Sequence, residues 1–480
     1  MGISLNPSTL LSGQGLDVNT LVSQLMNQKS GQLSEWQSEQ TTLQLQAGLI
    51  DAINGHLSSL ADAVTAMSDP LGALTAQSAI SSNTSIITAT AITSAPASTH
   101  TVVVNNLATV GLLYTDPVTG GADVSILPSG QDIADLKLQI GGASGTTADI
   151  QITAGSNDTL TTLADSINTQ STANQWGITA SVVTDADGAR LSITSAATGT
   201  PGALSITTNS STLNFSDPIG GTNASVSIDG TPYHYTTNTV PAGAISGVTL
   251  NLAGASPGTP VQITVGPDVQ QATDAINAFV AAYNQVINDL NTQFAVNIAT
   301  DSQGPLGSDS ALRSLQSNLM QDVTYSIEGN SGLVNLAALG INMNDDGTLT
   351  VGTTPSGQTM SQVLTANPSA FLNFFQNASA TGFANNFHSD LISLTDPTAG
   401  LLNVDLAQNK VQQQNVADSI NAFELQLTAQ QTELTKELSQ VNATLQSYPL
   451  LLQQVTEALG TMSSGSSSSD SSHPTLTSGL

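Results

Sequence analysis

The chain has 480 residues, and its 39% hydrophobic content can fill several cores, but only 9% of its residues carry charge. Six Lys and Arg residues stand against 35 Asp and Glu residues, which gives a net charge of −29. Nucleic acid is therefore excluded as a partner, because phosphate binding requires clustered Lys and Arg, and anionic lipid surfaces are excluded for the same reason. There is no cysteine, so disulfides, thiolate metal sites and cysteine nucleophiles are excluded as well.

The first residues, 1–17, are expected to form a flexible leader. They contain neither the basic segment nor the apolar run of a secretory signal. No stretch of the chain is apolar for long enough to cross a bilayer, so membrane insertion is not expected. A helix is predicted to begin at Asp17, because Leu16 and Leu21 flank it at the spacing of a hydrophobic staple and its carboxylate can cap the first turn.

Residues 18–68 are predicted to form one long helix with a coiled-coil seam. Apolar residues recur every seven positions through five heptads, which favours a coiled coil over an ordinary amphipathic helix. The expected seam residues are Leu21, Leu25, Trp36, Leu43, Ile50, Leu57 and Val64. Asp69 and Pro70 should end the helix.

After this helix the sequence changes to Thr, Val, Ile and Ser interrupted by Gly, Pro and Asn, which is typical of strands and turns. We divide this region into a β-rich middle domain, residues 81–127 together with 222–267, and a β-rich head domain, residues 128–221. One helix is expected in the head, with Asp158 as its cap. Asp187–Gly188 is expected to form a hairpin turn.

Helical periodicity then returns. Residues 268–460, together with 18–80, are predicted to form a helical stalk domain. Asp309 or Ser308 can cap one of its helices. The domain should include a small β element near residues 333–352, with a turn at Gly347.

The last helix is expected to run from about 404 to 460 and to kink at Pro449, because proline lacks the N–H that the helix needs. Its expected seam residues are Ile420, Leu427, Leu434, Val441, Leu445, Leu452 and Val455. The Ser-rich tail, residues 461–480, is expected to be disordered.

Heptad helices therefore occupy both ends of the chain. The economical arrangement pairs them with each other, or with copies from neighbouring chains, and holds the β-rich region away as an insertion. The predicted fold class is multidomain α+β. An elongated helical stalk, an antiparallel coiled coil or bundle built from both chain ends, would carry inserted β-rich head domains.

Residues that could carry chemistry are scattered. The five histidines do not occur at metal-ligand spacing, and there is no phosphate-binding loop or nucleophile elbow. Two acidic turns, residues 185–188 and 344–347, resemble the start of a calcium loop but lack its later acidic ligand, so turn chemistry explains them. We expect no enzyme activity, no cofactor and no metal.

The order of elements and several motifs resemble the flagellar filament cap family, also called hook-associated protein 2. GLDVNTLVSQLM, residues 15–26, is similar to the opening helix of that family, and residues 136–199 resemble the flagellin IN repeat. The most specific match is the block of residues 224–254. Its pattern residues are Asp229, Gly230, Asn238, Gly247, Val248, Thr249 and Leu250.

The resemblance implies a non-enzymatic cap at the distal tip of the bacterial flagellar filament. Such proteins form a homo-oligomeric ring, commonly of about five or six subunits. The ring retains exported flagellin and promotes its folding and polymerisation, on which filament elongation and motility depend.

The resemblance also implies a secreted protein that leaves the cell by flagellar type III export. Expected partners are flagellin, hook-associated proteins at the filament base before elongation, and a cytoplasmic export chaperone bound to the C-terminal helix. We place the chaperone contact around Ile420 to Leu445.

Two alternatives stay open. Another axial protein of the flagellum, a flagellin or a hook–filament junction protein, shares terminal heptads and sometimes the IN repeat. A secreted adhesin would use the β-rich head to bind a surface.

Overall fold

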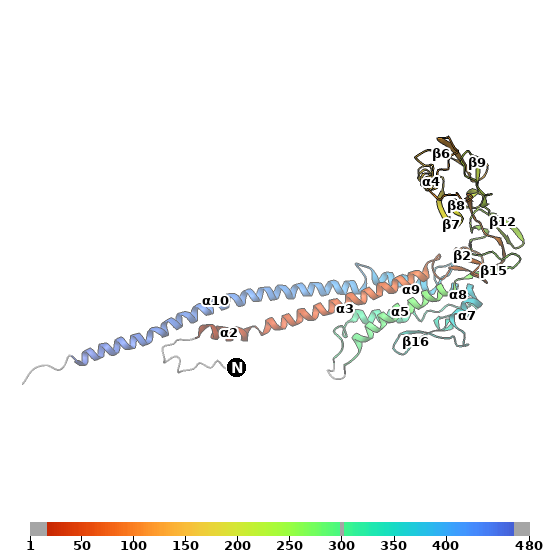
Figure 1. Ribbon diagram of the computed structural model, residues 1–480. Coiled ribbons are helices and arrows are strands. Elements are labelled where there is room, and N and C mark those ends of the chain that lie inside the picture. Colours follow the sequence, from red (N-terminus) through yellow and green to blue (C-terminus); the bar gives the residue numbers. More distant parts are fainter. Residues whose placement is uncertain (1–16, 298–301, 465–480) are drawn as a thin grey trace, which may run out of the picture.

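The structure is a computed structural model that describes residues 17–297 and 302–464, the side chains of 461–464 excepted. Long helices form a stalk, and the β domains lie together near one end of it (Figure 1). This confirms the predicted fold class. Most of the predicted leader and residues 465–480 of the predicted tail lie outside the described residues, while residues 461–464 continue the last helix.

Three helices build the stalk: α2 (Val18–Lys29), α3 (Gly31–Ser68) and α10 (Leu401–Ser464). The prediction of one helix over residues 18–68 is wrong at Ser30, where α2 ends and α3 begins. The Ser30 hydroxyl donates a hydrogen bond to the Asn27 carbonyl at 2.9 Å, and a glycine follows it. Serine competes for backbone groups and glycine is a poor helix former, so the pair interrupts the helix.

Shorter elements pack against one end of α3. They are α5 (Val269–Phe294), α6 (Ser310–Asp322), a 3₁₀ turn (Leu336–Leu339), β16 (Ile341–Met343), β17 (Leu349–Val351), α7 (Met360–Ala366), α8 (Pro368–Phe375) and α9 (Phe383–Thr395). Asp309 caps α6, and Gly347 takes a positive φ of 82° in the β16–β17 turn, both at predicted positions. The core they form with α3 is aromatic where α5, α8 and α9 meet. Its Phe side chains are Phe279, Phe371, Phe374, Phe375, Phe383 and Phe387.

The middle domain consists of two antiparallel sheets with a shared core. The five-stranded sheet has the order β1 (Gln77–Ser81), β15 (Val261–Pro267), β3 (Ser98–Asn106), β11 (Ala224–Ile228), β12 (Thr231–Tyr235). The three-stranded sheet has the order β13 (Thr239–Ile245), β14 (Val248–Leu252), β2 (Ile87–Ala91). Inward residues alternate along the strands, as in a sheet with one buried face.

The head has two further sheets and one helix. The four-stranded sheet has the order β10 (Ile219–Gly220), β4 (Val110–Tyr114), β8 (Gly188–Thr198), β7 (Ile178–Asp185), and the three-stranded sheet has the order β6 (Thr146–Thr153), β5 (Ile133–Ile140), β9 (Leu204–Asn209). The helix is α4 (Leu160–Asn174), and a 3₁₀ turn covers Thr200–Gly202. Thr159 caps α4 in place of the predicted Asp158, because the Thr159 hydroxyl accepts the Thr162 N–H in a capping box.

Strand pairing differs from the predicted domain boundaries in two places. β1 pairs with β15 along its whole length, so residues 77–80 lie in the middle domain and not in the stalk. β4 pairs with β8 and β10, and Ile126 is buried in the head core, so residues 110–127 lie in the head. We propose Gln77 and Val110 as the revised boundaries.

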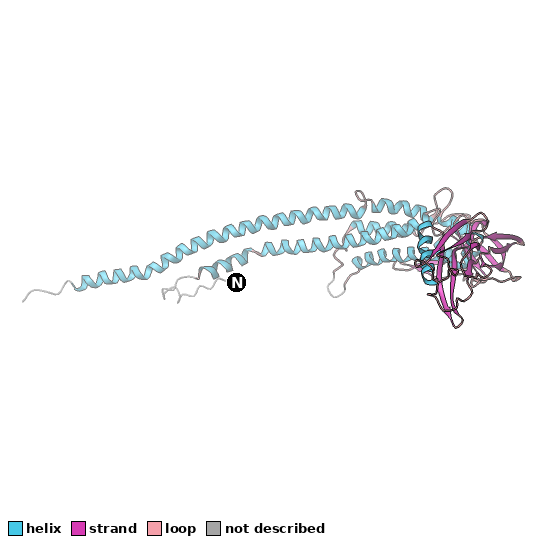
Figure 2. Ribbon diagram, turned by 45° about the horizontal axis from the view of Figure 1, so that its top comes forward, coloured by secondary structure: helices cyan, strands magenta, loops and turns pink. Residues whose placement is uncertain are grey.

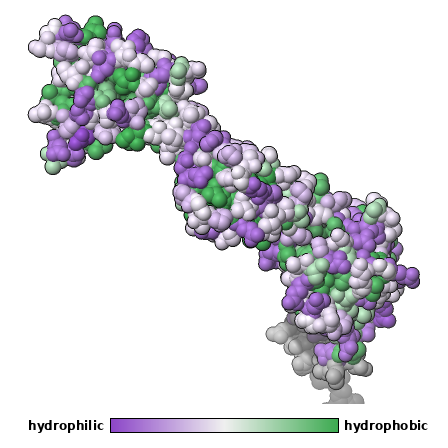
Figure 3. All heavy atoms as spheres, turned by 90° about the vertical axis from the view of Figure 1, so that its right-hand side faces the viewer, coloured by the Kyte–Doolittle hydropathy of each residue, from purple (hydrophilic) through white to green (hydrophobic). Residues whose placement is uncertain are grey.

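Strands gather at one end of the molecule, and helices alone reach the other (Figure 2). Seen from the β end, the molecule consists of successive lobes whose hydrophobic residues form small patches among polar ones (Figure 3). The far part of the stalk consists of helices without β structure.

Candidate assembly interface

The N-terminal helices and α10 run antiparallel in one continuous register. Lys29 Nζ donates to Gln430 Oε1 at 3.0 Å, Trp36 meets Phe423 edge-on with ring centroids 5.5 Å apart, Gln413 Nε2 donates to the Leu43 carbonyl at 3.3 Å, and Asn54 Nδ2 donates to Asn403 Oδ1 at 2.9 Å. Each advance along α2 and α3 is matched, to within one helical turn, by a retreat along α10. The register is kept across the interruption at Ser30.

The burial of the predicted seam residues falls along the stalk. Those nearest the β domains are buried: Leu43, Ile50, Leu57, Val64 and Ile420. Those further along are half-buried: Leu21, Leu25, Trp36, Leu427, Leu434 and Leu445. Three residues near the far end of α10 are exposed, on either side of the half-buried Leu445: Val441, Leu452 and Val455. The sequence analysis missed Val22, which is 3% exposed, and Phe423, the ring partner of Trp36.

Beyond α2, no described helix or strand covers the end of α10. The common register places Val18, the first residue of α2, level with Val441, and α10 continues from there to Ser464. Six large apolar side chains beyond Leu445 are between 53% and 65% exposed: Tyr448, Leu450, Leu451, Leu452, Val455 and Leu459. A contiguous row of this kind marks an interaction surface. We call residues 442–464 the α10 overhang.

The α10 helix passes through Pro449 without ending. Proline cannot donate to the carbonyl one turn earlier, that of Leu445. The overhang therefore contains a locally weakened turn next to its apolar row.

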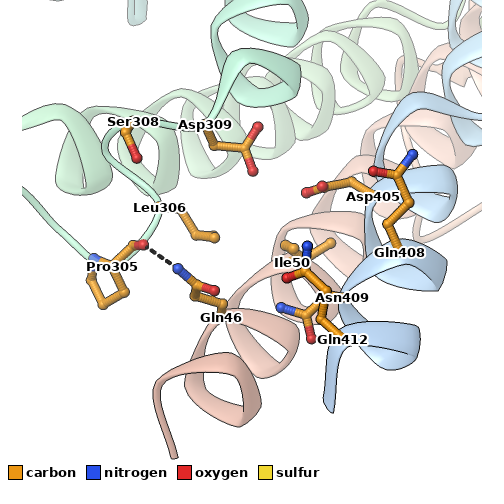
Figure 4. Close-up of a pocket in the computed structure, with 10 residues that line it drawn as sticks. All are labelled: Gln46, Ile50, Pro305, Leu306, Ser308, Asp309, Asp405, Gln408, Asn409 and Gln412. Carbon is orange, nitrogen blue, oxygen red and sulfur yellow. Dashed lines mark hydrogen bonds between the residues drawn. The ribbon is translucent and has the colours of Figure 1, made fainter. Parts of the chain in front are cut away.

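A polar notch lies where α6, α3 and α10 meet (Figure 4). The Asp309 carboxylate accepts the Ala311 N–H at 2.7 Å as the cap of α6, and Asp405 of α10 points toward it. On the α3 side, Gln46 donates to the Pro305 carbonyl at 2.8 Å. Burial, with the hydrogen bond and charge of Asp309, raises the pKa of Asp405 to about 6.

A second carboxyl pair lies at the other end of α6. Burial, reinforced by the neighbouring Asp390 carboxylate of α9, raises the pKa of Asp322 to about 7. The Tyr283 hydroxyl is buried without a hydrogen-bond partner, and its pKa is raised by burial and by the charge of Asp322. These pairs lie among helices. Within the described residues no group of three or more His, Asp or Glu side chains could hold a metal.

The motif residues of the block 224–254 hold the middle domain together. Asp229 accepts the Thr101 N–H at 2.9 Å and contacts His100 Nδ1 at 2.7 Å, and these two contacts lower its pKa in that order of importance. Asn238 bonds both backbone groups of Ala108, at 2.7 and 2.9 Å. Gly247 has a φ of 74°, and a Cβ there would lie 2.9 Å from that of Ala95. These motif residues therefore have structural roles in the middle domain.

The remaining candidate residues also have local roles. His56 contacts Asp289 at 2.5 Å and so links α3 to α5, and His388 of α9 contacts the Thr65 hydroxyl at 3.2 Å. In the acidic turn of the head, Asp185 accepts the Asp187 N–H at 2.9 Å, and this bond lowers its pKa. None of the described helices is both long and apolar enough to span a membrane.

An elongated assembly protein is the class that this architecture defines: a paired-helix stalk with an uncovered apolar end, carrying β domains. The chain matches the family of the flagellar hook-associated protein 2 C-terminus over residues 221–449 and of its N-terminus over residues 14–110. Residues 135–197 match the flagellin hook IN motif. The chain belongs to the flagellar hook-associated protein 2 family.

Individual relatives support this family assignment. The B-type flagellar hook-associated protein 2 of Pseudomonas aeruginosa is 26% identical over 477 residues, covering 90% of this chain and 96% of the relative. The flagellar hook-associated protein 2 of Escherichia coli is 25% identical over 357 residues, covering 70% and 73%. The crystal structure of the D1-D2-D3 domains of the flagellar cap protein FliD from Escherichia coli aligns with a TM-score of 0.54 at 24% identity, covering 75% of this chain and 99% of that one. This last match shows a common fold.

Proposed function

We propose that this chain is a flagellar filament cap protein that acts at the extracellular tip of the filament. The observation that carries the proposal is the α10 overhang, which extends an apolar row beyond the folded domains on a chain of the hook-associated protein 2 family. An exposed apolar helix end that packs on none of the large apolar side chains of the described domains is stabilised by association. The β domains lie near the other end, where they can meet arriving subunits.

The cap works as a homo-oligomer with flagellin as its partner. It retains exported flagellin at the tip and promotes its folding and polymerisation, so that the filament elongates. The seam residues of α2 and α3, beginning at Leu21, and those of α10, from Ile420 to Val455, serve this assembly. Some of them pack within one chain, and the others pack between copies. A ring of about five or six subunits agrees with the closed symmetry that most homo-oligomers adopt.

Deletion of the gene tests this function. The mutant should be non-motile and should release monomeric flagellin into the medium, and the full-length chain supplied in trans should restore filaments. Intact filaments and normal swimming in the deletion strain would contradict the proposal. Normal swimming with lost surface attachment would instead identify an adhesin, and loss of the filament without monomeric flagellin in the medium would identify a flagellin.

The export chaperone is proposed to bind α10 between Ile420 and Leu445. Several apolar side chains of this segment pack against α2 and α3 in the folded stalk, so the segment is free only while the stalk is open. Added peptide of residues 420–445 should compete for the chaperone with the full-length chain. A chaperone that binds the chain equally after Leu427→Ser and Leu434→Ser must contact another segment.

A further inference from the structure

One exposed side of α3 is lined by residues with little or no side chain. Gly48 and Gly55 lie on it seven residues apart, with Ala52 between them. A Cβ added at either glycine would meet nothing within 4 Å, so no contact inside the chain requires glycine there. A glycine inside a helix costs about 1 kcal/mol relative to alanine. Two of them on one face leave room for another helix to approach α3 closely. We call this surface the α3 glycine face.

A complementary surface lies on α10. Val404, Val411 and Leu425 are 39%, 61% and 73% exposed, and their spacing of seven and fourteen residues aligns them along one side of the helix. Leu402 and Ile420, which pack toward the other helices, are buried on the opposite side. The three exposed side chains therefore project away from the stalk. We call this surface the α10 outer face.

The antiparallel register sets these two faces at the same height. Asn54 is bonded to Asn403, and Gln413 to the Leu43 carbonyl. Val404 is thus level with Gly55, and Val411 with Gly48, to within one helical turn. A rotation of one copy onto the next, without a shift along the stalk, would bring each valine opposite a glycine.

The charges on the two faces also match. Among the described residues, Lys410 is the one cation without an ion pair or hydrogen bond; the others are Lys29, Lys137, Arg190, Arg313 and Lys436, each with a partner in the chain. Lys410 precedes Val411 on α10, and the exposed Asp51, which precedes Ala52 on α3, lies at nearly the same height. Copies with a net charge of −29 repel one another, so a cation placed against an acidic residue fixes where they can meet.

We propose that the α10 outer face of one copy packs on the α3 glycine face of a second copy, with Lys410 beside Asp51 of the second copy. Valine side chains then enter the space that the glycines leave, as knobs enter holes, and the absence of Cβ atoms lets the helix axes come close. The two faces are unlike, so the contact is heterologous, and repetition about an axis closes a ring. This inference rests on the proposed cap function for the existence of the ring and supplies the surfaces that build it.

Disulfide trapping tests the contact directly, because the chain has no cysteine. The full-length variant with Val411→Cys and Gly48→Cys should form, on mild oxidation, a reduction-sensitive ladder from dimer up to the closed ring. A bridge inside one chain would leave only monomer. The matched control, Val411→Cys with Ala281→Cys, places the second cysteine on the exposed side of α5 and should give no ladder. Assembled protein without the ladder, or a ladder in the control of equal extent, overturns the proposal.

Substitution of the glycines gives a second test. Gly48→Leu with Gly55→Leu should leave the unfolding temperature of the monomer unchanged or higher, because the added atoms meet open space, and should weaken self-association by at least about tenfold. Ala278→Leu with Ala281→Leu on α5 is the control and should associate normally. Lys410→Asp should weaken association in low salt, and adding Asp51→Lys should restore it. Association unaffected by the leucines contradicts the proposal.

The two proposals fail separately. A deletion strain that still builds filaments refutes the cap function, whatever the disulfide result. A strain whose filaments depend on the chain, but whose protein gives no ladder, retains the cap function and refutes the contact.

Discussion

Asp309 and Asp322 stand at the two ends of helix α6, and each meets a second carboxyl group on a neighbouring helix. Asp309 faces Asp405 of α10, and Asp322 faces Asp390 of α9. Burial and like charge raise the pKa of Asp405 to about 6 and that of Asp322 to about 7. A proton on Asp405 or Asp322 therefore removes the repulsion between like charges where α6 meets its neighbouring helix.

This relationship predicts that the attachment of α6 depends on pH. A carboxyl group whose pKa is raised on folding adds stability that is fully present below its unfolded value near 4 and is lost as pH rises through the folded value. The α6 amides should therefore be better protected from hydrogen exchange at pH 5 than at pH 8, after correction for the intrinsic exchange rate. Asp322→Asn should remove the loss and stabilise the domain at pH 8 by on the order of 1–2 kcal/mol, discounted for partial exposure. Equal protection of α6 at both pH values would show that the protonation of these carboxyl pairs does not control its attachment.

Burial predicts different outcomes at the two ends of the seam. Leu57 is fully buried, so Leu57→Ala should destabilise the stalk domain by about 2–5 kcal/mol. Leu452 is 62% exposed, so Leu452→Ala should change the unfolding temperature very little and weaken self-association instead. Thermal unfolding and sedimentation of the same samples separate the two effects. A large loss of monomer stability in the Leu452 variant would mean that the overhang folds back onto its own chain.

Pro449 should act as a local weak point. Pro449→Ala restores the donor for the Leu445 carbonyl, so residues 446–455 should gain hydrogen-exchange protection. Thr456→Ala, on the same overhang but without a proline, should not produce that gain. Unchanged protection after Pro449→Ala would mean that the overhang frays for another reason.

The family motif should be needed for the stability of the middle domain. Gly247→Ala forces a side chain into a positive φ and against Ala95, so we expect a loss of at least about 1–3 kcal/mol in that domain. Gly243→Ala on β13 is the matched control, because a Cβ there meets nothing and its φ is not positive. Denaturant unfolding of the full chain measures both. Equal stability of the two variants would contradict a structural role for Gly247.

Local signals were predicted well from the sequence, and contacts between distant residues were not. The α6 cap and the turn at Gly347 depend on a few adjacent residues. The cap is Asp309, one of the two residues predicted for it, and the turn is at the predicted glycine. The partner of β4 depends on a strand about eighty residues later, and strand texture does not identify partners.

The same limit explains what was missed in the site. Asp309 and Asp405 are far apart in sequence and show no spacing rule, so their encounter became visible only in the folded domain. The six Phe side chains of the stalk core are likewise spread over α5, α8 and α9. Heptad periodicity did identify the helices of the stalk, but it could not show where α10 extends beyond α2.

The interruption at Ser30 has a mechanical consequence. At that height the stalk has one continuous member, α10, and one interrupted member, and the register of Lys29 with Gln430 joins them just beside the gap. A pair of helices bends most easily where one of them is interrupted. Here α10 is the continuous helix, so it bends elastically beside Ser30. Torque or sideways load applied to the β domains should therefore concentrate as flexure near Ser30, while the segments on either side move as stiff levers.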